Sequence, residues 1–398
     1  MGLRVAIVGG GLGGLAAALY LRRAGVEAQV YEQAPVLREV GAGVMLAPNM
    51  VRLIARLGLG DALARCAVWL EEAWEYRRWE DGRVISSQPM GEACERLYGA
   101  NLHTAHRADL LAMFQDALPA SVVRLDHRCV ALDQDDAEVE LTFAHRSGGT
   151  TKVRADAVIG ADGIHSTVRP RIVAEAAPRF SGFSAFRALV PVERAPEYAR
   201  RRVQTLWLGP ARHVVHYPVS GGRLVNLVAV VPAGEWRLES WTADGELADF
   251  AREFEDWDVG LRRLIDAAPG TKRWALYDRA PLERWTSGRV TLLGDAAHAM
   301  LPFFAQGAGQ AIEDAAVLAR CLGGADPDMV PKALLSYEAT RRPRASRAQL
   351  MSRGRAEYNH LADGPEQRER DAGLREGDVL RHNAWLYAHD VDAEPLAT

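Results

Sequence analysis

The start of the chain alternates apolar runs with glycines in a pattern that predicts a βαβ unit. Residues 3–9 form a short β-branched run bounded by glycines, which predicts a buried strand. Residues 15–25 predict a helix that ends at Gly25, and residues 27–33 predict a second strand. A strand, a helix and a strand within about thirty residues imply a parallel sheet with a right-handed crossover.

The hydrophobic period changes several times further along the chain. Residues 51–67 have a helical period, and residues 69–88 are aromatic and alternating, as in strands of a different sheet. Residues 106–118 are helical again, and shorter strands then lead into the apolar segment 156–163.

The middle of the chain predicts an inserted antiparallel domain. Between Phe183 and Val231, alternating runs are separated by Gly and Pro turn signals at antiparallel spacing. Residues 289–300 return to a buried strand followed by a turn, and helices follow at 310–322 and from residue 332 onward. The predicted fold is therefore α/β: a discontinuous Rossmann-like nucleotide-binding domain, an inserted and mainly antiparallel sheet domain, and a helical C-terminus. The expected ranges are 1–75, 100–180 and 271–345 for the nucleotide-binding domain, 76–99 and 181–270 for the sheet domain, and 346–398 for the C-terminal segment.

Composition narrows the class of protein. Lys and Arg total 48 and Asp and Glu total 52, so the net charge is −4, and a nucleic-acid or anionic-membrane partner is not expected. The four cysteines form no CxxC pair, which favours reduced thiols over disulfides or a metal site. The uncharged stretch 5–21 is too rich in glycine for a membrane span or a signal peptide, so we expect a cytoplasmic protein.

An arginine-rich segment precedes the C-terminus. It contains six arginines between Arg341 and Arg355, and acidic residues follow soon after, from Glu357 to Asp371. Mixed charge of this kind is typical of a solvated helix face, which we favour over a phosphate-binding surface.

Three segments at predicted strand ends carry candidate chemistry. The first is Gly9-x-Gly11-x-x-Gly14, which follows a strand and opens a helix, with Glu32 at the end of the second strand. The glycines allow a tight turn, close approach of a pyrophosphate and close helix packing, and the carboxylate can accept hydrogen bonds from a ribose diol. The alternative, a glycine-rich turn beside a surface Glu, does not explain this context.

The other two segments are weaker signals when each is taken alone. Asp162-Gly163 follows one apolar run and Gly294-Asp295 follows another, although an Asp-Gly pair at a strand end is usually just a turn. The second of these leads, through small residues and Pro302, to a glycine-containing segment before a helix. The order and spacing of all three segments are more specific than any one of them.

With these motifs the chain resembles the single-component, FAD-dependent aromatic hydroxylases (class A flavoprotein monooxygenases). The resemblance rests on residues 9–15 with Glu32, on 160–169 and on 294–315, and it extends to 106–110 and 385–390. It is strongest to the branch of salicylate hydroxylase, 3-hydroxybenzoate 6-hydroxylase and 6-hydroxynicotinate 3-monooxygenase. It implies FAD as the bound cofactor, NADH or NADPH as a transient co-substrate, and hydroxylation of a small phenolic acid by O2 through a flavin C4a-hydroperoxide.

The resemblance also assigns cofactor contacts. Gly9, Gly11, Gly14 and Glu32 would hold the ADP half of FAD, and Arg107 would contact the flavin side. Asp162 and Gly163 match the motif linked to both FAD and the pyridine nucleotide, and Gly294 and Asp295 match the one that holds the ribityl chain. The loop Gln306, Gly307, Ala308 and Gly309 would approach the pyrimidine edge of the flavin, where a helix N-terminus stabilises negative charge.

The expected substrate site lies on the antiparallel sheet. His213 is the candidate general base for the phenol, with Tyr217 on the same strand face, whereas His216 falls on the opposite face. The pattern alone is more typical of a packed, hydrogen-bonded strand histidine, and it is the resemblance that favours the base. Pro302 is expected beside the substrate, and Phe303 makes that wall apolar, which favours a benzenoid ring. Arg187 and Arg212 are candidates for binding a substrate carboxylate, although Arg212 neighbours His213 and should face the other way.

Two alternatives stay open at this point. A flavoprotein of the same fold could act on a hydroxylated N-heterocycle, such as 6-hydroxynicotinate or urate, or as an epoxidase. A protein of another class, a non-catalytic sensor of FAD and an aromatic ligand, would bind the ligand without ligand-stimulated oxidation of NAD(P)H. The sequence leaves open the hydroxylated position, any accompanying decarboxylation, NADH against NADPH, and the oligomeric state, for which a homodimer is the default.

Overall fold

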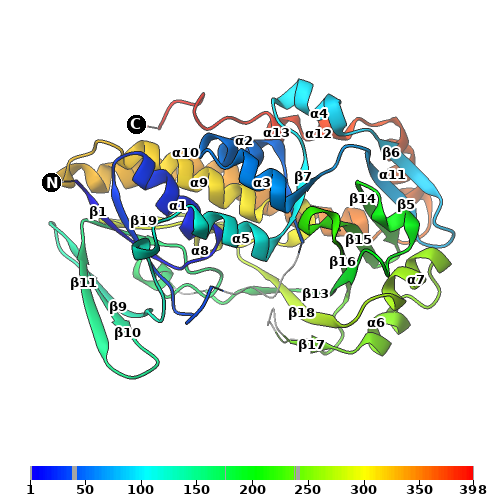
Figure 1. The fold of residues 1–398 in the computed structure, drawn as a ribbon, viewed down its shortest axis with the longest axis horizontal. Helices are drawn as coiled ribbons and strands as arrows, with labels where there is room; N and C mark the ends of the chain where they lie inside the picture. The colour runs from blue at the N-terminus through cyan, green and yellow to red at the C-terminus, as the bar shows by residue number, and fades with distance from the viewer. Residues whose placement is uncertain (1, 38–42, 175, 237, 239–242, 398) are drawn as a thin grey trace.

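The computed structural model describes residues 2–37, 43–174, 176–236, 238 and 243–397. The molecule is elongated, with the hairpin strands β9–β11 at one end and a large sheet at the other (Figure 1). Among the described residues, no helix is both long and apolar enough to cross a lipid bilayer.

A six-stranded, mostly parallel sheet forms the nucleotide-binding part. Its central strands β20, β12, β1 and β2 are parallel neighbours, so their carboxyl ends meet at one edge. The expected first strand, helix and second strand are confirmed as β1, α1 and β2. The strands in spatial order are β19 (Thr286–Ser287), β20 (Val290–Leu292), β12 (Ala157–Gly160), β1 (Arg4–Val8), β2 (Glu27–Tyr31) and β8 (Val123–Arg124).

Helices cover this sheet and build its apolar core. The helices α1 (Leu12–Arg23) and α9 (Gly307–Leu322) pack against each other, and both contain fully buried small residues, such as Ala17 and Ala315. The remaining helices of this part are α2 (Pro48–Arg56), α3 (Gly60–Cys66), α5 (Arg107–Asp116), α8 (Asp295–His298) and the long α10 (Val330–Asn359). A sheet of β3 (Gly43–Leu46), β7 (His103–His106) and β4 (Ala67–Trp69) and a sheet of β9 (Arg128–Gln134), β10 (Val139–Ala144) and β11 (Thr150–Ala155) complete it.

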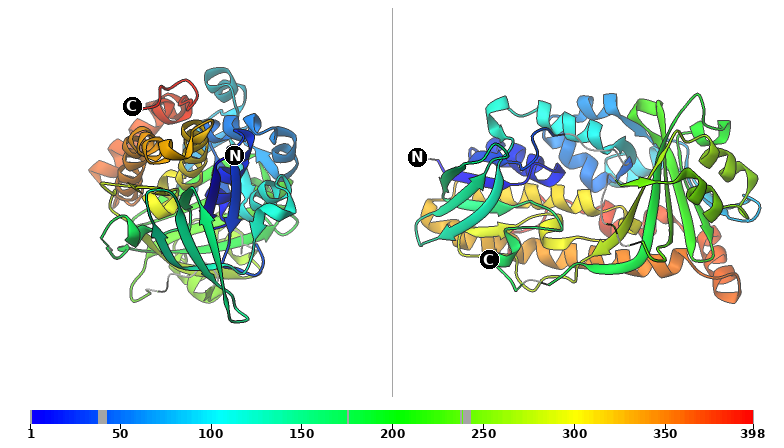
Figure 2. Two further views of the ribbon diagram at one scale, coloured as in Figure 1. Left: turned by 90° about the vertical axis from the view of Figure 1, so that its left-hand side faces the viewer. Right: turned by 90° about the horizontal axis from the view of Figure 1, so that it is seen from below.

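The eight-stranded sheet is antiparallel except at one pair, β14 with β5, and Figure 2 shows it standing apart from the N-terminal strands. Its strands in spatial order are β17 (Asp244–Gly245), β18 (Thr271–Asp278), β13 (Arg179–Pro191), β16 (Leu224–Pro232), β15 (Arg212–Val219), β14 (Val203–Gly209), β5 (Ala73–Arg78) and β6 (Val84–Gln88). Strand β18 pairs with β13 although the expected boundary at residue 271 assigns it to the other domain. The domain ranges themselves stay a prediction.

The two faces of this sheet bury different residues. One face packs Phe186, Trp207 and Val214 against the helices α6 (Leu247–Glu253) and α7 (Val259–Asp266). Residues paired across strands share a face, so His213, Val230 and Ala185 lie together on the other face. The same register places Tyr217 and Arg187 on that second face.

The C-terminus is helical, as expected. The helices α11 (Pro365–Glu376), α12 (Val379–His382) and α13 (Ala384–Tyr387) follow α10, and α4 (Gly91–Tyr98) lies near α12.

The expectation of a solvated arginine face on α10 is wrong for its central residues. The side chain of Arg341 is 1% exposed, and it forms ion pairs with Glu313 at 2.7 Å and Asp314 at 2.8 Å. Arg344 binds the same Glu313. The acidic residues that follow α10 in the sequence do not neutralise these arginines, because their partners are two carboxylates on α9.

Candidate active site

Four predicted cofactor residues meet at the carboxyl edge of the parallel sheet. Gly9 follows β1, Glu32 follows β2, Asp162 lies just after β12 and Asp295 lies just after β20. Ligands of open α/β sheets bind at this edge. Motifs that are far apart along the chain therefore lie next to one another in a single row.

Each glycine of the first turn is required, or leaves space, for a different geometric reason. Gly9 has a φ of +111°, and a Cβ there would lie 2.4 Å from the carbonyl oxygen of Ala161. A Cβ on Gly14 would lie 2.0 Å from the carbonyl oxygen of Gly9, so only glycine lets α1 pack on β1. Gly11, the N-cap of α1, has nothing within 4 Å of its Cβ position and an extended backbone. The chain itself leaves room at Gly11, beside the unpaired amides of the helix N-terminus.

This difference predicts opposite outcomes for two alanine variants. Gly14→Ala should lower the yield of folded protein, because its Cβ overlaps the backbone of Gly9. Gly11→Ala should fold normally without cofactor and lose FAD affinity by about tenfold or more, since its methyl group faces the pyrophosphate site. Thermal melts of the apoproteins and fluorescence titration with FAD measure both effects; equal FAD affinity in Gly11→Ala and the native chain would contradict the phosphate assignment.

The two carboxylates nearest this turn are held by backbone amides. Glu32 accepts hydrogen bonds from Gly10 N and Ala34 N, both at 2.7 Å, which aligns its carboxylate beside the glycine turn. One carboxyl oxygen of Asp162 accepts hydrogen bonds from Thr167 N at 2.7 Å and from Thr167 Oγ1 at 2.9 Å. Gly163, the next residue, has a φ of +78°, which supports the sharp turn.

The second half of the cofactor edge is formed by the loop 294–309. Gly294 has a φ of +63° and lets Asp295 project from the end of β20, where it is exposed. A Cβ on Gly307 would lie 3.9 Å from Asp295 Oδ1, so the carboxylate sits next to the first residue of α9. Gly307, Ala308 and Gly309 are the first turn of α9, and their amides have no carbonyl partner within the helix. The buried Gln306 is the N-cap residue.

A buried ionic network fixes this loop from beneath. Asp314 accepts hydrogen bonds from Gly294 N at 3.1 Å and lies 2.6 Å from His298 Nε2. Arg341 bridges Asp314 and Glu313, and Asn49 donates a hydrogen bond to Glu313 at 2.6 Å. A structural role for His298 fits this arrangement, because its ring is fully buried and contacts Asp314.

Because of this network, the free energy of unfolding should fall as the pH is lowered. Burial alone would raise the pKa of Glu313, but Arg341 and Arg344 lower it to about 2, from an ordinary value of 4.5. A depressed carboxyl pKa stabilises the fold fully above the ordinary value, and that contribution is lost as the pH falls through 4.5 toward 2. We expect the free energy of unfolding to fall across this window, measured by urea unfolding at a series of pH values. A flat profile between pH 5 and 3 would contradict it.

Buried polar atoms without hydrogen-bond partners among the described residues show, independently of the sequence motifs, that this edge of the sheet fits FAD. Within the described part of the chain, three buried polar atoms along this edge have no hydrogen-bond partner: Asp162 Oδ1, Asn49 Oδ1 and Gln306 Nε2. Buried polar atoms are normally paired, so a polar ligand with donors and acceptors would complete them. No sequence pattern indicated Asn49, which lies on α2 and is brought within 3.4 Å of Gln306 only by the packing of α2 on α9. Arg107 begins α5 directly after β7 and is half-buried.

The second face of the antiparallel sheet carries the predicted catalytic residues. His213 is 4% exposed, and its ring lies edge-on to Phe303 with 5.4 Å between ring centroids. Its Nδ1 lies 2.6 Å from Nε2 of His360, at the end of α10. His360 is a further candidate that no sequence pattern indicated. His216 points to the opposite face, against Trp207 and Tyr198, as the strand parity predicted.

Polar groups continue along this face beyond His213. Tyr217 is buried, which raises the pKa of its hydroxyl, and the guanidinium of Arg187 opposes that rise. Arg187 is 3% exposed and lies 4.8 Å from the ring centroid of Trp274. Asn226, opposite Tyr217 on β16, accepts a hydrogen bond from Gly43 N at 2.8 Å, whereas its Nδ2 is buried without a partner among the described residues. No sequence pattern indicated Asn226 either.

Not every candidate is brought to this face. Arg212 points to the other side of the sheet, where it forms a salt bridge of 2.9 Å with Glu253 on α6. The register of β15 puts neighbouring residues on opposite faces, so Arg212 cannot meet a substrate beside His213. Pro302 begins the 3-10 turn Pro302–Phe304 and is exposed.

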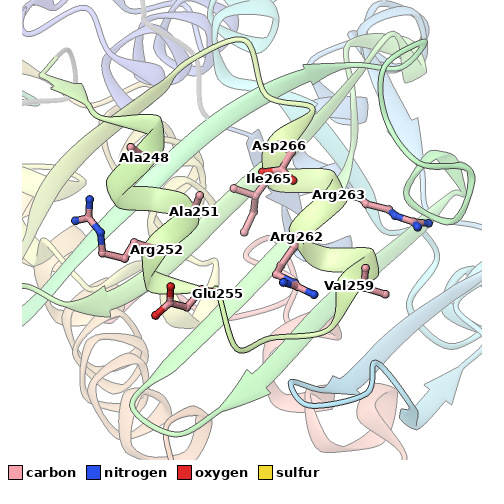
Figure 3. Close-up of a pocket in the computed structure, with 9 residues that line it drawn as sticks. All are labelled: Ala248, Ala251, Arg252, Glu255, Val259, Arg262, Arg263, Ile265 and Asp266. Carbon is pink, nitrogen blue, oxygen red and sulfur yellow. The ribbon is translucent and has the colours of Figure 1, made fainter.

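A surface groove of about 530 Å³ lies elsewhere, along α6 and α7 (Figure 3). Arg252, Glu255, Arg262 and Asp266 are among its charged lining residues. None of the predicted site residues lines it, and both helices lie on the face of the sheet opposite to His213. It is therefore separate from the candidate active site.

Comparison with known proteins agrees with this geometry. The model of a family described as "FAD binding domain" matches residues 2–352. A 3-amino-4-hydroxybenzoate 2-monooxygenase of Streptomyces platensis is 44% identical over 98% of this chain and 96% of its own length. The salicylate hydroxylase of Pseudomonas putida is 36% identical over 99% and 94%. The structure of HpxO from Klebsiella pneumoniae in complex with FAD and uric acid matches with a TM-score of 0.85 and 27% identity, covering 99% of this chain and 97% of that one.

Proposed function

This chain belongs to the FAD binding domain family, among its class A flavoprotein hydroxylases, and on that premise we propose that it hydroxylates an aminohydroxybenzoate or a similar phenolic acid with NADH and O2. The relatives named above support the substrate class, since the Streptomyces platensis enzyme is named for 3-amino-4-hydroxybenzoate. We favour a benzenoid over a heterocyclic substrate because Phe303 presents an apolar ring to His213.

One observation carries the proposal: the loop 302–309 joins the two halves of the site. Its end supplies the amides of α9 beside Asp295, and its start places Phe303 against His213. A cofactor held along the sheet edge and an aromatic ring held on the antiparallel face would therefore meet at one loop. No such meeting is needed in a protein that only binds nucleotide.

One set of residues would bind the cofactor, and another would bind the substrate. Gly9, Gly11, Gly14 and Glu32 would hold the ADP half of FAD, while Asp162, Asp295 and the amides of Gly307, Ala308 and Gly309 would hold the flavin half. When bound, FAD supplies the chemistry that the side chains lack, namely reduction by NADH and the use of O2. The chain's own part is to orient the ring, exclude water and control the phenolic proton.

His213 and Arg187 are the side chains proposed to bind the substrate. A neutral imidazole at His213 Nε2 would accept the phenolic proton, because phenolate is the more electron-rich ring. Tyr217 and Nδ2 of Asn226, an atom without a partner among the described residues, would orient the ring between them. Arg187, which the strand register places on the same face as His213, would bind the substrate carboxylate through a charged hydrogen bond.

A pair of arginine variants tests the carboxylate assignment. Arg187→Met should raise the dissociation constant of the acid by about 10- to 100-fold, the effect of losing a charged hydrogen bond of about 1.5–3 kcal/mol. Arg212→Met should leave it unchanged, because Arg212 pairs with Glu253 on the other face. Titration of the flavin absorbance with the acid measures both constants. Equal affinity in both variants would move the carboxylate site away from Arg187.

The function itself is tested by oxygen-dependent oxidation of NADH with a panel of acids. The panel contains 3-amino-4-hydroxybenzoate, salicylate, 3-hydroxybenzoate and 6-hydroxynicotinate, with catalase present to expose wasted peroxide. We expect one of the benzoates to stimulate NADH oxidation and to yield a product heavier by one oxygen atom. Stimulation by 6-hydroxynicotinate alone would favour the heterocycle, and binding without any stimulation would favour a sensor.

A further inference from the structure

The C-terminal segment 385–390 carries part of the family resemblance, and the proposed function gives it no role. Its backbone is bound by arginines of two helices. Arg52 of α2 donates a hydrogen bond to the carbonyl oxygen of Tyr387 at 2.9 Å, and Arg344 of α10 donates one to the carbonyl oxygen of Trp385 at 3.0 Å. Helix α13 also packs on α2, which carries one of the buried polar atoms at the cofactor edge (Figure 1). The segment is therefore fixed to an element of the site.

Trp385 connects this segment to the loop 302–309. Its ring is nearly parallel to that of Phe304, with 14° between the planes and 6.2 Å between the centroids, which is the offset stacking that aromatic pairs favour. The guanidinium carbon of Arg347 on α10 lies 4.0 Å from the centroid of the indole. Within the described part of the chain, Nε1 of Trp385 is buried without a hydrogen-bond partner. Ring contacts, and not a hydrogen bond of the indole, therefore join Trp385 to the loop.

The two phenylalanines of this loop pack in different apolar clusters. Phe303 packs beside Leu301 and Trp274 and lies edge-on to His213, on the substrate side. Phe304 packs in the cluster that contains the buried leucines of α11, α12 and α13. The two residues are consecutive in one 3-10 turn, so a shift of Phe304 must also shift Phe303.

The backbone after this turn is strained. Ala305 has a φ of +51°, in the left-handed region that residues with a side chain rarely adopt. Such a conformation persists where the surrounding contacts impose it. Ala305 packs in the same apolar cluster as Phe304 and Trp385, which places these contacts on the C-terminal side of the loop.

The two ends of the loop region are held by other contacts. Before the turn, Ser352 of α10 donates a hydrogen bond to the carbonyl oxygen of Leu301. After the turn, the ionic network around Arg341 fixes α9, whose first amides face the cofactor. The stack of Phe304 on Trp385 lies between these two anchors. Loss of the stack should therefore move the middle of the loop and leave the cofactor end in place.

We propose that Trp385 is a positioning residue for hydroxylation: it stacks on Phe304 and so fixes the loop with Phe303 against the aromatic substrate. This role rests on the proposed function. A substrate ring that is held loosely is not presented to the cofactor in the reactive orientation. NADH, a proton and O2 then give NAD⁺ and H2O2, and the acid is released unchanged. Trp385 thus raises the share of NADH that yields product.

The first test measures the loop without turnover. Hydrogen exchange of backbone amides is followed by mass spectrometry in the FAD-bound protein, with neither NADH nor substrate present. In Trp385→Leu we expect amides of residues 303–306, such as the Ala305 N–H that bonds to Pro302, to exchange about tenfold faster or more. Strands β15 and β16 should exchange as in the native protein. Native exchange of the loop in Trp385→Leu would overturn the positioning role.

The second test measures the product formed per NADH consumed, with the panel acid that the native enzyme hydroxylates. In Trp385→Leu we expect this ratio to fall by about threefold or more, with peroxide accounting for the difference. The dissociation constant of FAD should change by less than about threefold, because Arg341 still fixes α9. Trp385→Phe should restore the ratio, since a phenyl ring can stack on Phe304 and the lost Nε1 has no partner among the described residues.

The matched control is Trp257→Leu, which removes the same ring system from another apolar cluster. Trp257 is 5% exposed and packs on Phe254 and Trp79, on the face of the sheet opposite to His213. It should lower the free energy of unfolding and leave both the loop exchange and the product ratio as in the native enzyme. An equal fall of the ratio in Trp257→Leu and Trp385→Leu would assign the effect to stability and overturn the proposal.

The outcomes separate this proposal from the proposed function. If the native enzyme hydroxylates no acid, the proposed function is overturned, and the positioning role with it. If the native enzyme hydroxylates an acid and Trp385→Leu does so with the native ratio, the positioning role alone is overturned, even where the loop exchanges faster.

The native protein gives a further reading that does not depend on the folding of a variant. Hydrogen exchange in low concentrations of urea gives the free energy of each local opening. Opening of the C-terminal segment removes Trp385 from Phe304, so the loop amides should require no larger opening free energy than those of residues 385–390. Loop amides that stay protected after the segment has opened would overturn the proposal.

Discussion

Replacement of His213 by alanine should lower product formation by about 10²- to 10⁴-fold, the usual contribution of a positioned acid or base. FAD binding should persist, because His213 lies on the antiparallel face, where it contacts His360 and Phe303, and not on the edge of the parallel sheet. Reduction by NADH in the presence of substrate should also persist. Quantification of the hydroxylated product, with NADH oxidation measured in parallel, gives both values.

The matched variant for this prediction is His216→Ala on the same strand. Its ring is just as buried but packs on Trp207 and Tyr198, away from the site. It should lower stability and leave the ratio of product to NADH consumed unchanged. Unchanged product formation in His213→Ala would remove His213 from the reaction.

Replacement of Arg341 by methionine should destabilise the fold by about 3–5 kcal/mol, because two buried carboxylates lose their shared cation. The loop that carries Asp295 should loosen as well, since Asp314 would no longer be held between Arg341 and the amide of Gly294. We therefore expect weaker FAD binding together with the lower stability. Urea unfolding of the apoprotein and titration with FAD measure the two effects separately.

The neighbouring Arg342 is the control for that variant. Its side chain is 40% exposed and lies 3.6 Å from Glu338 one helical turn away, so Arg342→Met should change the free energy of unfolding by about 0.5 kcal/mol or less. If the Arg341 and Arg342 variants were equally stable, the buried network would not be what holds the loop.

Much of the fold could be predicted because local patterns report it directly. The βαβ unit, the inserted antiparallel strands and the glycine turn each have a signature within a few residues, and the parity of β15 correctly separated His213 from His216. Gly9, Asp162 and Asp295 lie in one row because each follows a strand of the same parallel sheet, and parallel strands share a carboxyl edge.

The parts that escaped prediction depend on contacts between distant segments. The mixed charges around Arg341 in the sequence are typical of a solvated helix face. Only the packing of α10 on α9 shows that Glu313 and Asp314 form ion pairs with Arg341. His360 and Asn226 carry no local signal, because a histidine at a helix end and an asparagine in a strand are ordinary residues until a partner strand or helix is placed beside them.

The most direct test of the proposed hydroxylation is incorporation of ¹⁸O from labelled O2 into the product. The purified holoenzyme is incubated with NADH, ¹⁸O2 and each acid of the panel, and the products are analysed by mass spectrometry. We expect a benzoate carrying a phenolic hydroxyl to gain one oxygen atom, and this atom to come from O2. NADH oxidation that yields only peroxide with every acid, or a product whose new oxygen comes from water, would contradict it.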